Sequence, residues 1–192
     1  MEPADLARVL RSHRIRTVLN LRGSHPESPW YRGERAATLA AGATQVDIPL
    51  SSCEWMSRAQ ARALLEVLEA AQRPLLVHCF HGSERTGMVA AFAELLRPGS
   101  TLGDAEGQFT LRHLYVGLGD GVVTHRHLEA YRAWLLARST PHTPDRFRRW
   151  LLAEYTPGQP CREQWDYDPY PLVVTTRAPA PNVSRSARPP RR

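Results

Sequence analysis

The residues best suited to chemistry lie close together, in the stretch LLVHCFHGSERTG between Leu75 and Gly87. Cys79 follows an apolar run, Gly82 interrupts the polar segment after it, and Arg85 stands six residues beyond the cysteine. A cysteine thiolate is a nucleophile, and a guanidinium group can bind two oxygens of a phosphate at once. The spacing therefore indicates nucleophilic attack on a bound oxyanion, provided that the fold brings both side chains to one place.

The cysteine comes directly after a predicted strand, and a predicted helix begins soon after it. The strand is PLLVH, residues 74–78, and the helix is TGMVAAFAELL, residues 86–96, beginning near Arg85. In an open parallel sheet, ligands bind beyond the carboxyl ends of the strands, where the next helix begins. Loop 80–85 is expected to supply backbone N–H groups there, which together with the helix dipole bind an anion and lower the pKa of the thiol.

The order of the elements predicts an α/β fold, with a central, mainly parallel sheet flanked by helices and a helical C-terminal half. Two apolar strands, 16–23 and 44–50, precede the strand at the cysteine. Ser57 and Gln60 have the spacing of a capping box and mark a helix start. The predicted helices cover Asp5 to His13, 28–43, 61–71, 86–96, the residues after Thr101 including Phe109, Leu111 and Leu114, 127–137, and the residues after Thr143.

The chain of 192 residues is predicted to form one domain over residues 1–156, followed by two short segments. Residues 157–176 are rich in proline and aromatic residues and are predicted to pack on the domain as irregular structure. Residues 177–192 contain five arginines and no acidic residue, which predicts a disordered tail. Most of the net charge of +6 lies in this tail, since the remainder has 20 basic and 19 acidic residues. No nucleic-acid partner is therefore expected.

The composition is that of a soluble protein, with 42% hydrophobic and 23% charged residues. No apolar run approaches the roughly 20 residues that span a bilayer, and the N-terminal MEPADLARVL has neither the positive charge nor the apolar stretch of a signal peptide. Cys53, Cys79 and Cys161 form neither a disulfide framework nor a zinc-binding pattern. We therefore expect a cytoplasmic protein with reduced thiols, no metal site and no membrane span; the oligomeric state is left open.

The stretch HCFHGSERTG resembles the active-site signature of the protein tyrosine phosphatase superfamily, His-Cys-x5-Arg-(Ser/Thr)-Gly. TVLNLRG, WYRGERAATLAAGATQVDIPLS and PLLVHC also follow one another as in the small, atypical dual-specificity branch found in bacteria, plants and fungi. The resemblance covers Arg16 to Leu96. It implies a cysteine-dependent phosphomonoesterase, that is, a tyrosine or dual-specificity protein phosphatase, which acts through a cysteinyl-phosphate intermediate without a cofactor.

The resemblance also implies a role for each matched residue. Cys79 would attack phosphorus, Arg85 would bind the phosphate and stabilise the transition state, and Thr86 would donate a hydrogen bond to the departing sulfur. His78 would orient the cysteine and its loop. The phosphate-binding residues would be Phe80, His81, Gly82, Ser83 and Thr86.

The family also uses a carboxylic acid that protonates the leaving oxygen, and three carboxylates are candidates for it. The loop after the second strand has serine where an aspartate is expected. Glu84 is favoured because it stands in the anion-binding loop beside Arg85, although it could instead orient that arginine. Glu54 lies on the loop after the second strand and could be a solvated charge. Asp47 lies within that strand, 32 residues before Cys79, and could be a structural hydrogen-bond acceptor.

Two other functions remain open at this point. A rhodanese-like sulfurtransferase also has a cysteine in a cradle loop, but the Arg-Thr-Gly ending argues against it. A non-catalytic phosphate-binding module is kept open by the uncertain acid. The partner is expected to be a phosphorylated protein or a small phosphorylated substrate. Because loop positions 80, 81 and 83 carry no lysine or arginine, a less charged substrate such as a phosphoprotein is favoured.

Two further expectations concern the first strand and the helix after it. Arg22 follows the strand, and an ion pair with Glu34 is favoured over a position in the pocket. The helix at 28–43 is predicted to bury Trp30 and Leu39.

Overall fold

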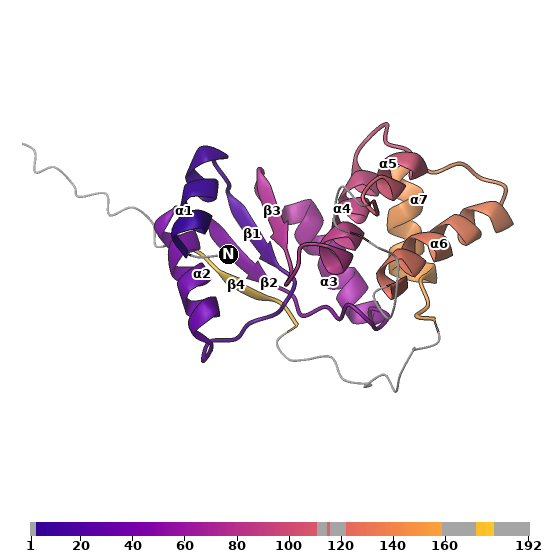
Figure 1. Ribbon diagram of the computed structural model, residues 1–192. Helices are drawn as coiled ribbons and strands as arrows, with labels where there is room; N and C mark the ends of the chain where they lie inside the picture. The colour runs from indigo at the N-terminus through magenta and orange to yellow at the C-terminus, as the bar shows by residue number, and fades with distance from the viewer. Residues whose placement is uncertain (1–2, 111–114, 116–121, 159–171, 179–192) are drawn as a thin grey trace, which may run out of the picture.

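The computed structural model describes residues 3–110, 115, 122–158 and 172–178. These residues form an α/β fold with a four-stranded sheet in the order β3-β1-β2-β4. The first three strands are parallel, and β4 runs antiparallel to β2 at the edge (Figure 1). The predicted fold class and mainly parallel sheet are thereby confirmed. The strands are β1 Thr17–Asn20, β2 Thr44–Asp47, β3 Leu75–His78 and β4 Val174–Thr176.

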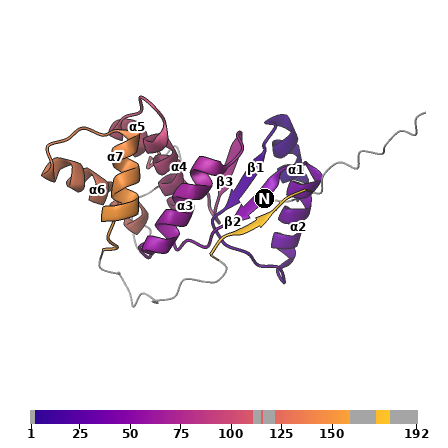
Figure 2. The same cartoon turned by 180° about the vertical axis from the view of Figure 1, so that it is seen from behind.

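Helices cover both faces of the sheet. Helices α1 and α2 lie on one face and α3 and α4 on the other, and the remaining helices stack beyond α4, as both views show (Figures 1 and 2). The helices are α1 Pro3–Ser12, α2 Pro29–Ala40, α3 Arg58–Ala70, α4 Glu84–Leu96, α5 Leu102–Glu106, α6 Val122–Ala137 and α7 Pro144–Arg149, which continues as a π-helical turn over Trp150–Glu154.

Local sequence signals account for the start and orientation of α3. Ser57 Oγ accepts a hydrogen bond from the Gln60 N–H at 3.0 Å, and Gln60 Oε1 accepts one from the Ser57 N–H at 2.9 Å. This is the predicted capping box, and Thr101 and Asp104 form a second one at α5. The apolar positions of α3 recur with helical spacing and face the core; Ala61, Leu64, Leu65 and Leu68 are all buried.

Helix α5 is shorter than predicted. It ends at Glu106, and Gly107 forms its C-cap. Phe109, which was expected to lie on this helix, follows in a turn, while residues 111 and 114 lie outside the described residues. Glycine is a common helix terminator, so the helical spacing of the following apolar residues was misleading here.

The buried residues of α2 also differ from the prediction. Trp30 and Leu39 are only half-buried, whereas Tyr31 and Thr38 are buried. Trp30 instead presents its ring to the Arg22 guanidinium. The prediction was wrong because it weighed size and hydrophobicity, whereas the buried face of α2 is partly polar.

The segment expected to be irregular contains strand β4. Its residues pair with β2 so that Thr176 lies opposite Gln45 and Val174 opposite Asp47. The β-branched run VVTT favours a strand, and an antiparallel partner fits the open edge of β2. Residues 159–171 and 179–192 lie outside the described residues, so the proposed domain boundaries and the disordered tail remain predictions.

The strands are buried on both sides by two apolar clusters. The larger lies between the sheet and helices α3 to α7, and the smaller packs α1 and α2 against β1 through Leu6, Leu10, Ile15 and Val18. Within the described part of the chain, no helix has the length and apolar character to cross a membrane, and no group of three or more His, Cys, Asp or Glu residues could hold a metal ion.

Candidate active site

Cys79 lies where two neighbouring strands end. Asn20 of β1 pairs with His78 of β3, and the Leu21 N–H donates to the His78 carbonyl oxygen at 2.9 Å. Cys79 follows immediately and is buried, with 6% of its surface exposed. The carboxyl ends of β1 and β3 therefore place the thiol at the edge of the sheet, where parallel sheets bind their ligands.

The loop 80–83 connects Cys79 to α4. Gly82 has a φ angle of +76°, a left-handed conformation that favours glycine. The N–H groups of Gly82 and Thr86 lie close to the sulfur. Burial alone raises the pKa of the Cys79 thiol, but the Thr86 hydroxyl, the two N–H groups and the Arg85 charge together lower it below its ordinary value. The surroundings of the sulfur therefore favour the nucleophilic thiolate.

The Arg85 side chain is held by two backbone carbonyl groups. Its Nη1 donates to the carbonyl oxygens of Leu21 at 3.3 Å and of Leu50 at 3.0 Å. Its Nε is buried without a hydrogen-bond partner among the described residues. The Thr86 hydroxyl is likewise buried, and the acceptor beside it is the Cys79 sulfur, whose pKa it lowers. Buried donors are rarely unpaired in native proteins, so Arg85 Nε is available to bind a ligand acceptor.

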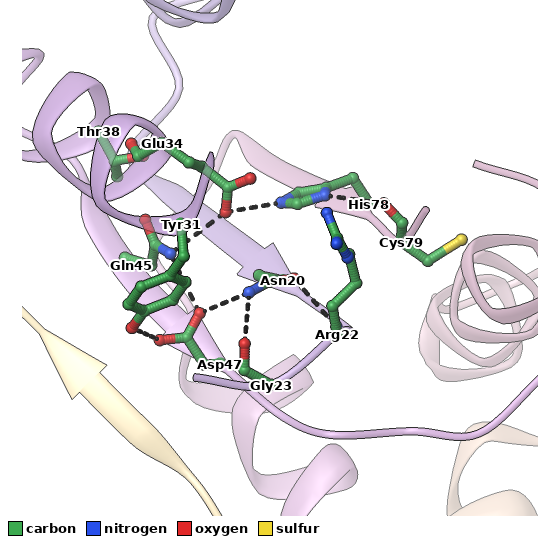
Figure 3. Close-up of polar contacts among 10 residues, drawn as sticks. All are labelled: Asn20, Arg22, Gly23, Tyr31, Glu34, Thr38, Gln45, Asp47, His78 and Cys79. Atoms are coloured by element: carbon green, nitrogen blue, oxygen red, sulfur yellow. Dashed lines mark hydrogen bonds and ion pairs between the residues drawn. The ribbon is translucent and has the colours of Figure 1, made fainter. Parts of the chain in front are cut away.

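His78 lies next to the cysteine in the chain and contacts two hydrogen-bond acceptors. Its Nδ1 lies 3.2 Å from the Cys79 carbonyl oxygen, and its Nε2 lies 3.1 Å from Glu34 Oε1 (Figure 3). A carbonyl oxygen and a carboxylate both accept hydrogen bonds, so these contacts favour the imidazolium form, in which both ring nitrogens donate. Burial lowers the pKa of His78, but the hydrogen bond and charge of Glu34 outweigh burial and raise it. Glu34 thus pairs with His78, and the expected ion pair between Glu34 and Arg22 is wrong.

A buried chain of hydrogen bonds links this pair to the end of β1 (Figure 3). Gln45 Nε2 donates to Glu34 Oε1 at 3.2 Å and to Asp47 Oδ1 at 3.1 Å. Asn20 Nδ2 donates to the same Asp47 oxygen at 2.9 Å, and the Tyr31 hydroxyl donates to Asp47 Oδ2 at 2.6 Å. These bonds join β1, β2 and α2 beneath the site and fix the strand ends from which its residues project.

Asp47 belongs to this network rather than to the pocket. Its carboxylate accepts three hydrogen bonds, and the residue is only 1% exposed. These three donors, from Asn20, Gln45 and Tyr31, occupy both carboxylate oxygens and hold them within the network. Of the two roles considered for Asp47, the structural one is supported.

The variant Asp47→Asn is expected to lower the free energy of unfolding by about 3 kcal/mol, because an amide NH₂ group would face buried donors. Urea denaturation followed by circular dichroism measures the change. Asp5→Asn is the matched control, since Asp5 is exposed and pairs only with Arg8 at the surface; its expected effect is below about 1 kcal/mol. Equal losses in the two variants would contradict the role given to Asp47.

The other two candidate acids, Glu84 and Glu54, lie outside this network. Glu84 is the first residue of α4 and is half-buried. It makes no ion pair with Arg85 in the described structure, where carbonyl groups hold the guanidinium. Glu54 is half-buried on the loop after β2, beside Trp55. Neither carboxylate forms a hydrogen bond or ion pair with the described residues, and Glu84 lies near enough to Tyr115 to raise the pKa of its hydroxyl.

His127 fixes the loop that carries Glu54, a role that sequence reasoning missed. Its Nε2 accepts a hydrogen bond from the Met56 N–H at 3.1 Å, and its Nδ1 donates to the Val123 carbonyl oxygen at 2.8 Å. The Trp55 ring lies against it, with centroids 4.6 Å apart. Burial lowers the pKa of His127 to about 4, so the ring is neutral at neutral pH. A lone histidine on a helix gives no sign in the sequence of a partner so distant along the chain.

Stability is expected to fall as the pH drops from about 6.5 to about 4. The pKa of His127 is lower in the folded chain than in the unfolded chain, so the unfolded chain binds the proton more tightly in this range. The shift corresponds to about 3 kcal/mol, present above the unfolded pKa and lost as the pH falls through the folded one. Urea denaturation at several pH values measures this loss. In His127→Gln the pH dependence should be much weaker; an unchanged dependence would show that another group causes it.

Comparison with known proteins agrees with this geometry. Residues 3–100, just over half of the chain, match the family model described as "Tc-R-P: Polymorphic toxin system, DSP-PTPase phosphatase". The matched region contains β1 to β3, the loop after Cys79 and all of α4. No curated protein matches the chain. The chain therefore belongs to the DSP-PTPase phosphatase family of polymorphic toxin systems, and it contains a phosphatase domain.

Proposed function

We propose that the protein is a cysteine-dependent phosphomonoesterase of the tyrosine or dual-specificity type. One observation carries the proposal: the buried, unpaired Arg85 Nε lies in the same loop as a thiol whose pKa is lowered by the Thr86 hydroxyl, two backbone N–H groups and the Arg85 charge. A phosphate ester has the acceptor oxygens that such donors need and the electrophilic phosphorus that a thiolate attacks. In this proposal the stretch HCFHGSERTG, residues 78–87, is a phosphatase-type cysteine loop. The residues around the phosphate are Phe80, His81, Gly82, Ser83 and Thr86.

In the first step, the Cys79 thiolate attacks phosphorus. The S–P bond forms, the bond from phosphorus to the leaving oxygen breaks, and that oxygen takes a proton from a carboxylic acid. Arg85 and the loop N–H groups bind the equatorial oxygens, where negative charge is held in the transition state. His78 acts as a positioning residue, since its hydrogen bond to the Cys79 carbonyl oxygen holds the start of the loop.

In the second step, water attacks the cysteinyl-phosphate. The carboxylate formed in the first step takes a proton from the water, and the resulting P–O bond replaces the S–P bond. Thr86 donates a hydrogen bond to the sulfur as it leaves, which stabilises the thiolate. Phosphate and the original cysteine are released. Neither step uses a metal, so a chelator should not slow turnover, and the thiol must stay reduced, as it does in the cytoplasm.

We propose Glu84 as the acid, with Glu54 as the alternative. Glu84 lies directly before Arg85 at the start of α4, and carbonyl groups rather than Glu84 hold that arginine in the described structure. This arrangement supports proton donation over an orienting role. Glu54 is the alternative because it lies between two anchored points of the same segment: the Leu50 carbonyl group contacts Arg85, and the Met56 N–H donates to His127.

Replacing Glu84 with Gln is expected to slow tyrosyl phosphate hydrolysis by about 10²–10⁴-fold, and nitrophenyl phosphate hydrolysis much less. The reason is that nitrophenolate leaves without help, whereas a poorer leaving group needs the proton. Steady-state rates on the two substrates measure the difference, with Glu54→Gln as the matched variant. Equal slowing on both substrates would give Glu84 a positioning role, and the same signature in Glu54→Gln alone would transfer the acid role to Glu54.

The function itself is tested with an aryl phosphate and with thiosulfate. Turnover of the aryl phosphate in the presence of a chelator supports the proposal. Turnover of thiosulfate without aryl phosphate hydrolysis would indicate a sulfurtransferase instead, and phosphate binding without any turnover would indicate a binding module.

A further inference from the structure

Arg22 presents a guanidinium that forms no direct ion pair with the described residues, beside the proposed active site. The group lies over the Trp30 ring at 3.4 Å from its centroid, with the Phe80 ring on another side at 5.1 Å. Arg22 is half-buried, yet its side chain makes no hydrogen bond or ion pair with the described residues, and Glu34, the nearest candidate, pairs with His78. A stacked guanidinium keeps its N–H donors at the edge of the group, where they can bind an anion.

The backbone around Arg22 is fixed by the buried network. The Arg22 N–H donates to Asn20 Oδ1 at 2.9 Å, and the Asn20 amide donates to the Gly23 carbonyl oxygen at 2.9 Å. Gly23 has a φ angle of +80°, and a Cβ there would lie 3.0 Å from Pro49 Cβ. The turn after β1 is thus tightly constrained, and stacking on Trp30 constrains the side chain as well. The guanidinium is therefore held in one position before any ligand binds.

Arg22 also lies within electrostatic range of the reacting groups. Figure 3 shows its side chain rising from the end of β1 toward His78 and Cys79. Burial lowers its pKa, Glu34 raises it, Arg85 lowers it and Cys79 raises it, so the guanidinium interacts with all three of these groups. Two arginines, Arg22 and Arg85, are therefore near the thiol, whereas the first phosphate needs only Arg85 and the loop.

We propose that Arg22 binds a second anionic group of the substrate, a carboxylate or a second phosphate that lies next to the phosphoester being cleaved. This inference rests on the proposed phosphatase activity and narrows its substrate class. Loop positions 80, 81 and 83 carry no lysine or arginine, which by itself favours a substrate of low charge. In this proposal the site gains its second positive charge from Arg22, on the turn after β1, and therefore accepts a substrate with two anionic groups. Phe80, which is 65% exposed, forms the side of this subsite and contacts the part of the substrate between its two anions.

Two substrate pairs test the inference and show whether the second anionic group is a carboxylate or a phosphate. The first pair is a phosphotyrosine peptide with glutamates on both sides of the phosphotyrosine and the same peptide with glutamines. The second is an aromatic 1,3-bisphosphate and phenyl phosphate. The wild type should prefer the more anionic member of at least one pair by about tenfold or more in kcat/KM. Preference in the first pair identifies a carboxylate of an acidic phosphopeptide, and preference in the second identifies a polyphosphorylated small molecule.

The variant Arg22→Met keeps apolar contact with Trp30. For the pair in which the wild type shows a preference, it should reduce the ratio of the two kcat/KM values to near one. Arg22→Lys should retain part of it, because the charge remains without the planar fork. The exposed Arg11→Met is the control and should keep the wild-type ratio. No preference in either pair for the wild type, or an undiminished preference in Arg22→Met, would overturn the inference. A binding experiment separates the phosphatase proposal from the Arg22 proposal: the affinity of the four compounds is measured for Cys79→Ser and for the double variant Cys79→Ser, Arg22→Met. If the wild type hydrolyses none of the four compounds, the proposed activity fails. A preference in binding that depends on Arg22 would still show the anion subsite.

Discussion

Replacing Cys79 with serine is expected to reduce aryl phosphate hydrolysis by about 10³-fold or more. A serine hydroxyl is not ionised at neutral pH, whereas the surroundings of the Cys79 sulfur lower the pKa of the thiol. Phosphate binding should survive, because the Arg85 guanidinium, with its unpaired Nε, and the backbone N–H groups of the loop are unchanged by the substitution. Steady-state rates measure the first effect, and isothermal titration with inorganic phosphate or vanadate measures the second.

The matched control for this substitution is Cys53→Ser. Cys53 is the other described cysteine, and it lies half-buried on the loop after β2, where its N–H donates to Ser51 Oγ at 3.2 Å. Its replacement should leave the rate within about threefold of the wild type. Residual turnover of Cys79→Ser within tenfold of the wild type would show that the thiolate is not the nucleophile.

Replacing Arg85 with methionine is expected to lower kcat/KM for the same substrate by about 10³-fold or more, the range seen when an arginine that stabilises a phosphoryl transition state is removed. Unlike Cys79→Ser, this variant should also lose phosphate binding, because the guanidinium supplies the charged donors. The Arg85→Lys variant should recover little, since a lysine cannot contact two phosphate oxygens and the carbonyl groups of Leu21 and Leu50 at once.

A control for Arg85→Met is Arg97→Met at the exposed end of the same helix, where Arg97 forms an ion pair with Glu94. It should bind phosphate and turn over substrate as the wild type does. Thermal unfolding should accompany both measurements, because Arg85 also ties two strand ends together. An Arg85→Met variant that folds and still binds phosphate normally would contradict the assignment of the anion site.

The elements that deliver the cysteine could be predicted because their signals are local. The apolar run before Cys79, the glycine in the loop and the capping box at Ser57 and Gln60 each act within a few residues. The order of strands and helices then limits the fold to a parallel sheet, and the carboxyl end of β3 becomes the expected site. The edge strand β4 was missed because its partner, β2, lies more than 120 residues earlier in the chain.

The polar partners behind the site could not be predicted, because they join residues far apart in sequence. Glu34 has two basic neighbours in space, and only the geometry shows that His78 takes its carboxylate while Arg22 stacks on Trp30. In the same way, Asp47 lies at a plausible distance from the cysteine along the chain, but three buried donors hold it in the network. Residue type and spacing indicated possible chemistry, and burial decided between the roles.

The central claim, that Cys79 carries the phosphoryl group during turnover, is tested most directly by trapping the intermediate. The wild type is mixed with an aryl phosphate and quenched with acid within milliseconds, and its peptides are analysed by mass spectrometry. The account predicts a phosphoryl group on Cys79 that is absent from Cys79→Ser. It also predicts that this group disappears from the wild type when the reaction is diluted into buffer without aryl phosphate before the quench. Turnover with a phosphoryl group on a different residue, or with an unmodified Cys79 at every time point while Cys79→Ser remains active, would contradict it.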